Sequence, residues 1–214
     1  MAPAANNTSN YCVSFKDIQS AADTLQGQIV RTPLIAAPKL SALTGADVFV
    51  KYENLQFTNS FKDRGAFLKL SSLKPDERKR GVIAMSAGNH AQAVAYHASR
   101  LDIAAVIVMP ENTPFVTIGN TEALGAEVVL SGETLQESRA MADQIAGQRK
   151  LTLIHPYDDP LVIAGQGTVG LEVLTDEPDI EVLVAPIGGG GLIADTAVNG
   201  TRIGSSESSV RRRR

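Results

Sequence analysis

The stretch 81–110, "GVIAMSAGNHAQAVAYHASRLDIAAVIVMP", decides the fold class of this 214-residue chain. Its two ends, 81–86 and 103–110, are continuous apolar runs of strand length, and a proline stops the second run. The segment between them has apolar residues at helical spacing. Continuous apolar strands separated by a helix are typical of a parallel sheet that helices cover on both faces.

The same alternation continues toward the C-terminus. Further strands are predicted at 126–132, 151–156 and 181–191, with a helix at 133–150. Parallel sheets of this kind bind ligands at the carboxyl ends of their strands. Three loops of unusual composition lie at such ends or at a helix start, and they are the candidate ligand sites: 59–62, 86–90 and 188–191.

Composition restricts the possible functions. Twenty basic residues against 23 acidic ones leave a net charge of −3, which indicates no general nucleic-acid-binding surface. No window approaches the roughly 18 consecutive apolar residues of a membrane-spanning helix, so no membrane partner is expected. The single cysteine, Cys12, and the absence of signal-peptide features favour a cytoplasmic location. No histidine or carboxylate pair has metal-ligand spacing, so no metal is predicted.

The run "PIGGGGLIAD" (186–195) has four consecutive glycines after an apolar segment. Glycine tolerates backbone conformations that direct several N–H groups to one point, and a helix beginning at Leu192 would add a favourable partial charge for an anion. The run therefore predicts a phosphate site. The alternative is a flexible turn. A P-loop is excluded, because no Gly-Lys-Ser/Thr follows.

A second glycine pattern, "GQGTVG" (165–170), matches the dinucleotide-binding fingerprint letter for letter. That interpretation needs a preceding strand and an acidic residue about 20 positions later. Here helix-start signals precede the pattern, with Asp158 or Asp159 as the cap and Pro160 in the first turn, and position 185 is Ala185. A helix packed closely on the sheet is therefore the preferred prediction.

The loop "SAGNHAQA" (86–93) brings Ser86, Asn89 and His90 to the turn between a buried strand and a helix. Backbone N–H groups at such a turn can bind a carboxylate, and an asparagine amide can donate to a phenolate-type oxygen. Alternatively, Asn89 or Ser86 merely caps the helix. His97 and His155 are interpreted as packing or surface residues.

Lys62, in "NSFKDRGA" (59–66), follows Phe61 at the predicted start of a helix. Burial by Phe61 and a helix N-terminus would both favour the neutral amine. A neutral amine forms a Schiff base with an aldehyde. One aldehyde that also carries a phosphate and a phenolic oxygen is pyridoxal phosphate. It would account for three loops together, through Lys62, Asn89 and the glycines 188–191.

Seven motifs together resemble the fold-type II pyridoxal-phosphate enzymes, most of all the threonine dehydratases (threonine ammonia-lyases), with serine racemase as a near neighbour. They span about Phe15 to Ala194 and occur in the family's order: "RTPL" (31–34), "ENLQ" (53–56), "SFKDRGA" (60–66), "SAGNHAQAVA" (86–95), "ALGAEVVL" (123–130), "PYDDPLVIAGQGTVGLEVL" (156–174) and "PIGGGGLIA" (186–194).

This resemblance implies roles for individual residues. Lys62 would carry the cofactor as a Schiff base, beside Phe61, and Asn89 would contact the ring oxygen. The phosphate cup would consist of Gly188, Gly189, Gly190, Gly191 and Leu192. The loop that receives the substrate carboxylate would consist of Ser86, Ala87, Gly88 and His90.

The resemblance also implies the architecture, an α/β fold of two open, mostly parallel-sheet, three-layer domains. Residues 55–150 would form the small domain, and residues 1–54 with 151–194 part of a large cofactor-binding domain. Family members continue for roughly a hundred residues beyond the glycine cup, so the large domain is expected to be incomplete. Residues 195–214 do not resemble the family and are predicted to be disordered. A homo-oligomer is expected if the large domain were complete.

The implied reaction is β-elimination of L-threonine, and of L-serine, to a 2-oxo acid and ammonia. Racemases of the family have a serine where this chain has Ala87, so dehydration is favoured over racemisation. A serine-racemase-like or other fold-type II activity is the alternative. A third possibility is a catalytically inactive fragment that only binds the cofactor or a partner, and the 214-residue chain is expected to have little or no activity.

Overall fold

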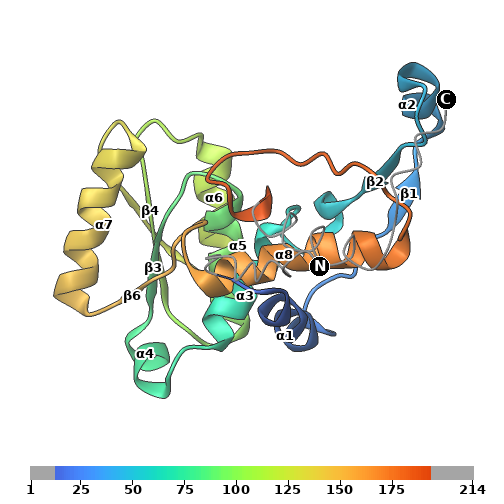
Figure 1. Cartoon of the computed structure of the whole chain (residues 1–214). Coiled ribbons are helices and arrows are strands. Elements are labelled where there is room, and N and C mark those ends of the chain that lie inside the picture. The colour runs from blue at the N-terminus through green and yellow to red at the C-terminus, as the bar shows by residue number, and fades with distance from the viewer. Residues whose placement is uncertain (1–12, 194–214) are drawn as a thin grey trace, which may run out of the picture.

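The computed structural model describes residues 13–193 (Figure 1). Cys12 and the tail 195–214, on which expectations were stated, lie outside the described residues. The first half of the described chain contains α1 (Phe15–Leu25), β1 (Leu34–Ala36), α2 (Pro38–Thr44), β2 (Phe49–Lys51), the short 3-10 helix η1 (Glu53–Leu55), α3 (Lys62–Ser71), α4 (Pro75–Arg80), β3 (Val82–Met85) and α5 (Asn89–Arg100). The second half contains β4 (Ala105–Met109), α6 (Phe115–Ala123), β5 (Glu127–Leu130), α7 (Leu135–Arg149), β6 (Thr152–Leu153) and α8 (Pro160–Asp176).

A four-stranded sheet with the order β5-β4-β3-β6 forms the centre of the fold, and all its pairs are parallel. The expected strands at 81–86, 103–110, 126–132 and 151–156 all occur in it, the last shortened to two residues. The helix expected at 133–150 is α7, where the Thr134 side chain accepts a hydrogen bond from the backbone of Glu137. The predicted parallel α/β sheet is therefore confirmed.

Alternate residues of the central strands face two separate cores, because side chains along a strand point to opposite faces. Val82 and Ile107 face a core that includes much of α5. Ile83 and Val106 face a second core with Ala142 of α7. Helices thus cover both faces of this sheet, as Figure 1 shows for α5 and α7.

A second, two-stranded sheet is antiparallel and consists of β1 and β2. With α2 it projects away from the rest of the molecule, at the end opposite α7 (Figure 1). Leu43 of α2 is 82% exposed. No helix in residues 13–193 is long and apolar enough to cross a membrane.

Helix α8 contains the "GQGTVG" pattern, and Asp159 caps it by accepting hydrogen bonds from two backbone N–H groups. The predicted helix and its cap are therefore confirmed. Its predicted packing partner is wrong. A Cβ at Gly165 would lie 2.7 Å from the Gly65 Cα, so α8 packs closely on α3 rather than on the sheet. Both glycines allow this close approach of two backbones.

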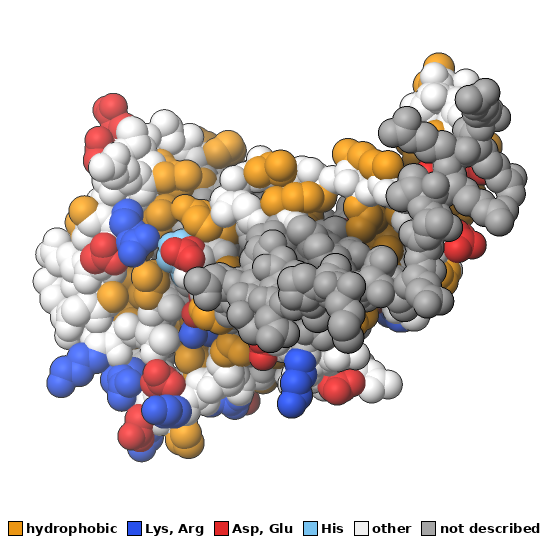
Figure 2. Space-filling view, viewed as in Figure 1, with side chains coloured by type: hydrophobic (Ala, Val, Ile, Leu, Met, Phe, Trp, Pro, Cys, Tyr) orange, Lys and Arg blue, Asp and Glu red, His pale blue; other side chains and the backbone are white. Residues whose placement is uncertain are grey.

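The strand expected at 181–191 does not form, which corrects the prediction. Residues 181–187 are extended but unpaired within the described part of the chain. Val184 is 94% exposed and Ile187 is 73% exposed. Figure 2 shows apolar side chains along the path that this segment follows in Figure 1. An apolar run becomes a strand only when a neighbouring strand takes up its backbone N–H and C=O groups.

Candidate functional site

Lys62 is the first residue of α3, and its backbone N–H donates to the Ser60 Oγ at 3.3 Å. Its Nζ donates to the Pro156 carbonyl oxygen at 2.6 Å and lies 5.4 Å from the centre of the Phe61 ring. Burial lowers the pKa of the Lys62 amine below its ordinary value. The predicted setting, a partly buried lysine at a helix start, is therefore present, and burial shifts its pKa in the predicted direction.

His90 lies near Lys62 at the carboxyl end of the central sheet. Its Nε2 is 3.0 Å from the Ile154 carbonyl oxygen, just beyond β6, and the residue is buried. Because a carbonyl can only accept, Nε2 carries the proton and Nδ1 is an acceptor. Nδ1 has no hydrogen-bond partner among the described residues. Burial, with a smaller effect from the Lys62 charge, lowers the pKa of His90 to about 4.

The glycine run packs against Tyr157. A Cβ at Gly189 would lie 2.2 Å from the Tyr157 ring, and one at Gly191 would lie 3.2 Å from the Tyr157 carbonyl oxygen. Gly190 has a φ of +90°, a conformation that favours glycine. Helical residues begin at 191, one residue before the predicted start. The geometry expected of an anion cup, a glycine turn leading into helical backbone, is present.

One short segment, 154–157, connects these parts. Ile154 contacts His90, Pro156 contacts Lys62, and Tyr157 contacts the glycine run. Tyr157 also packs edge-on against His155. Three candidate loops, far apart in the sequence, therefore border one four-residue segment.

The loop 86–90 does not cap the following helix with a side chain, as one of its two interpretations predicted. Gly88 is the N-cap of α5, and no side chain caps this helix. The Ser86 Oγ instead accepts a hydrogen bond from the Gly88 N–H at 3.3 Å. Capping by Asn89 or Ser86 is therefore wrong as an explanation of this loop, and Asn89 stands exposed at the first position of the helix.

Two buried polar clusters beside Lys62 were not predicted. The Asp63 carboxylate accepts from the Thr58 N–H and hydroxyl at 2.9 Å each, and His97 Nε2 lies 2.9 Å from it. Arg64 binds Glu53 and Glu172. The sequence signal that could have indicated them is a charged pair, Asp63-Arg64, inside a helix whose next four residues, 65–68, are apolar or glycine. Within residues 13–193 no group of histidine, cysteine or carboxylate side chains is arranged to hold a metal.

Fold and site together are typical of α/β enzymes that combine an activated lysine with a glycine-rich anion cup. Residues 25–198 match the family described as pyridoxal-phosphate dependent enzyme. The chain belongs to this family, whose cofactor is pyridoxal phosphate, and the resemblance inferred from the motifs is confirmed.

Relatives within the family carry related names. An L-threonine ammonia-lyase of Thermotoga maritima is 48% identical over 186 residues, which cover 87% of this chain and 46% of that protein. The catabolic L-threonine dehydratase TdcB of Staphylococcus aureus is 46% identical over 188 residues, 87% of this chain and 54% of that protein. The chain thus spans about half the length of these relatives.

Solved structures resemble the chain over most of its length. Maize serine racemase superposes with a TM-score of 0.88 at 33% identity, covering 92% of this chain and 60% of that one. Threonine deaminase isoform 2 of Solanum lycopersicum superposes with a TM-score of 0.84 at 41% identity, covering 89% and 53%. These matches confirm the predicted fold class.

The pKa of His90 predicts a dependence of stability on pH. The folded-state pKa of about 4 lies below the ordinary value of 6.5, so the unfolded chain binds a proton more readily. Keeping His90 neutral therefore contributes to the free energy of unfolding. This contribution is fully present above about pH 6.5 and is lost as pH falls toward 4, and the free energy of unfolding then changes by about 1 kcal/mol per pH unit. Urea unfolding from pH 7 to pH 4.5 measures the slope.

The variant His90→Gln should remove this part of the slope, because a Gln amide can still donate to the Ile154 carbonyl but does not titrate. The matched control is His155→Gln, which changes a more exposed imidazole on the neighbouring segment and should retain the His90 slope. Equal slopes in His90→Gln and the unmodified protein would contradict the prediction.

Proposed function

We propose that this chain binds pyridoxal phosphate through Lys62 and acts in the β-elimination of L-threonine and L-serine to a 2-oxo acid and ammonia. The observation that carries the proposal is Lys62 itself, a lysine at a helix start whose pKa is lowered by burial and which shares the segment 154–157 with the glycine run. The names of the relatives, threonine ammonia-lyase and threonine dehydratase, support this reaction class.

The residues present fit the cofactor. The glycine run offers backbone N–H groups at the start of helical residues, a suitable setting for a phosphate. The turn needs a glycine at Gly190, and Gly189 has no room for a side chain. His90 Nδ1 is a buried acceptor without a partner among the described residues. We propose that the cofactor is held by Lys62, Phe61, Asn89, Gly188, Gly189, Gly190, Gly191 and Leu192.

The proposed mechanism assigns each chain residue a limited task. The bound cofactor supplies an electron sink for the negative charge that develops at the substrate α-carbon. Lys62 Nζ, whose pKa burial lowers, takes the α-proton in its neutral form. Ser86, Ala87, Gly88 and His90 border the place of the substrate carboxylate, where backbone N–H groups at the start of α5 can donate to it.

Ala87 bears on the stereochemical outcome. Racemisation needs a second acid–base group on the far face of the substrate, and the methyl group of Ala87 cannot transfer a proton. Elimination needs no acid–base group on that face. We therefore expect 2-oxo acid rather than the D-amino acid as the product.

We further propose the division into a small domain, 55–150, and a cofactor-binding domain formed by 1–54 with 151–194. A homo-oligomer in the cytoplasm is proposed with it. Three of the four strands of the parallel sheet, β3, β4 and β5, lie within the first unit, while β6, which pairs with β3, lies in the second. Exposed apolar residues at 182–187 are consistent with association.

The experiment adds pyridoxal phosphate to the purified chain and records the visible absorbance that arises when the cofactor joins a lysine. Ammonia, 2-oxo acid and D-amino acid are then measured with L-threonine and L-serine. We expect cofactor attachment, equal amounts of 2-oxo acid and ammonia, and little D-serine. The rate should lie well below the roughly 1–1000 per second typical of enzymes, because 181–187 is unpaired in the described chain.

Each other outcome has a definite meaning. Attachment without turnover would favour the alternative of a cofactor-binding module. Comparable amounts of pyruvate and D-serine would contradict the role given to Ala87. Failure of the cofactor to attach at all would overturn the proposed function.

A further inference from the structure

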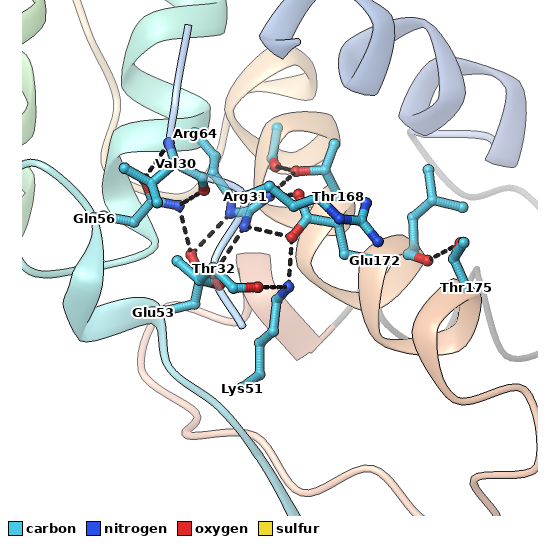
Figure 3. Close-up of polar contacts among 12 residues, drawn as sticks. Val30, Arg31, Thr32, Lys51, Glu53, Gln56, Arg64, Thr168, Glu172 and Thr175 are labelled. Carbon is cyan, nitrogen blue, oxygen red and sulfur yellow. Dashed lines mark hydrogen bonds and ion pairs between the residues drawn. The ribbon is translucent and has the colours of Figure 1, made fainter. Parts of the chain in front are cut away.

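Arg64 is the centre of a buried charge cluster that the proposed function does not use (Figure 3). Its guanidinium binds Glu53 through two hydrogen bonds, of 2.8 and 2.7 Å, and Glu172 through two more, of 2.7 and 3.0 Å. A fifth hydrogen bond, of 3.0 Å, goes to the Thr168 hydroxyl. All five N–H donors of the guanidinium are therefore satisfied, although the side chain has no solvent exposure.

The cluster is balanced in charge and joins four segments of the chain. Lys51 Nζ lies 2.5 Å from Glu172 and donates to the Thr32 carbonyl oxygen at 2.7 Å. The Thr32 hydroxyl donates to Glu53 at 2.5 Å. Two cations thus face two carboxylates from 51–53, α3 and α8, and Thr32 adds the fourth segment, as Figure 3 shows.

The charge states of the cluster are mutually reinforced. Burial would lower the pKa of Arg64, but hydrogen bonds to Glu53 and Glu172 raise it above its ordinary value. Burial would raise the pKa of Glu172, but its hydrogen bond with Arg64 and the positive charges of Arg64 and Lys51 lower it. Both shifts favour the charged form of the group concerned.

Stability alone is a weak reason for such a cluster. Buried ion pairs are often no more stabilising than apolar residues of similar volume, since desolvation of the charges offsets their attraction. What a bidentate guanidinium does provide is a fixed geometry. Here the fixed object is the first turn of α3, which carries Lys62 two residues before Arg64.

The geometry of the helix explains how the contacts of Arg64 affect Lys62 on the other side of α3. Successive residues are about 100° apart around a helix, so Lys62 and Arg64 point to nearly opposite sides of α3. Arg64 points to Glu53 and Glu172, while Lys62 reaches Pro156. A helix held by five hydrogen bonds on one side presents its opposite side at a fixed position.

We propose that Arg64, clamped by Glu53 and Glu172, is a positioning residue that fixes the first turn of α3 and thereby holds the Lys62 amine in place. The inference rests on the proposed function, in which Lys62 binds the cofactor. Displacement of a reacting group by about 1 Å can cost about 10²-fold in rate. Loosening the clamp should therefore slow the reaction of Lys62 more than it disturbs the fold.

The test measures the reactivity of the Lys62 amine in two ways, both in the full chain. The first is the rate at which pyridoxal phosphate becomes bound to Lys62, trapped by borohydride and located by peptide mapping. The second uses no cofactor and follows acetylation of Lys62 against pH, which reports the pKa of its amine. Urea unfolding of every variant confirms that each is measured in its folded state.

Arg64→Lys retains the charge but not the planar fork, so it cannot bind both carboxylates bidentately. We expect its cofactor attachment to be at least about tenfold slower, and the acetylation midpoint of Lys62 to move up toward that of an ordinary lysine. Glu172→Gln, which keeps the shape of the side chain, should show the same changes to a smaller degree. It also serves as the test if Arg64→Lys does not fold.

The matched control is Arg149→Lys, which alters an Arg–Glu pair of the same length, 2.7 Å to Glu127, on the exposed surface. It should leave both readouts unchanged. Folded Arg64→Lys and Glu172→Gln proteins with unmodified attachment rate and midpoint would overturn the inference. Absence of attachment in the unmodified chain would instead refute the proposed function, while the acetylation midpoints would still test the clamp.

Discussion

Replacing Lys62 with alanine is expected to abolish covalent attachment of pyridoxal phosphate and to lower 2-oxo acid formation by at least about 10²–10⁴-fold, the range for losing a positioned acid–base group. The Lys62 amine is partly buried, and its pKa is lowered by that burial. It also borders the same segment as the glycine run, through Pro156 and Tyr157. We expect no other lysine of the described chain to react with the cofactor in its place.

Borohydride trapping followed by peptide mapping measures this directly. In the unmodified chain the label should appear on Lys62, and in Lys62→Ala no specific label should remain. Lys79→Ala is the matched control, because Lys79 is exposed on α4 and its loss should change neither labelling nor turnover. A label on a different lysine, or a Lys62→Ala variant that still binds the cofactor covalently, would refute the assignment.

Local patterns predicted the central sheet well. The apolar runs at 82–85 and 105–109 are buried on both faces, so their sequences carry the signal of a strand without reference to any partner. The run at 182–187 is also apolar, yet it forms no strand. Pairing depends on another strand, and that dependence is invisible in the run itself.

The site was predictable to the extent that its parts are local. Lys62 after Phe61 at a helix start, and four glycines before a helix, can be recognised within ten residues. The clusters around Asp63 and Arg64 could not be recognised in this way. Arg64 contacts Glu53, which is 11 residues away in the sequence, and Glu172, which is 108 residues away. Glu53 lies in η1, and the contact with Glu172 is set by the packing of α8 on α3.

That packing depends on glycine at two facing positions. A Cβ at Gly165 of α8 would lie 2.7 Å from the Gly65 Cα, 2.9 Å from the Gly65 nitrogen and 3.0 Å from the Arg64 carbonyl carbon. All three are backbone atoms of α3, so no side chain can rotate away to make room. An added methyl group must therefore push the two helices apart.

Gly165→Ala is accordingly expected to destabilise the fold by about 3 kcal/mol, the upper part of the range for overpacked cores, although alanine is the better helix former. The matched control is Gly147→Ala in α7, where an added Cβ meets nothing within 4 Å. There the substitution should stabilise the chain, by up to about 1 kcal/mol. Urea unfolding of both variants measures these two changes in stability, which have opposite signs.

Since α3 carries Lys62 and Arg64, folded Gly165→Ala should also attach the cofactor more slowly, whereas Gly147→Ala should not. A Gly165→Ala protein as stable as the unmodified chain would show that α3 and α8 are not in such close contact, and the positioning of Lys62 through Arg64 would lose its structural basis.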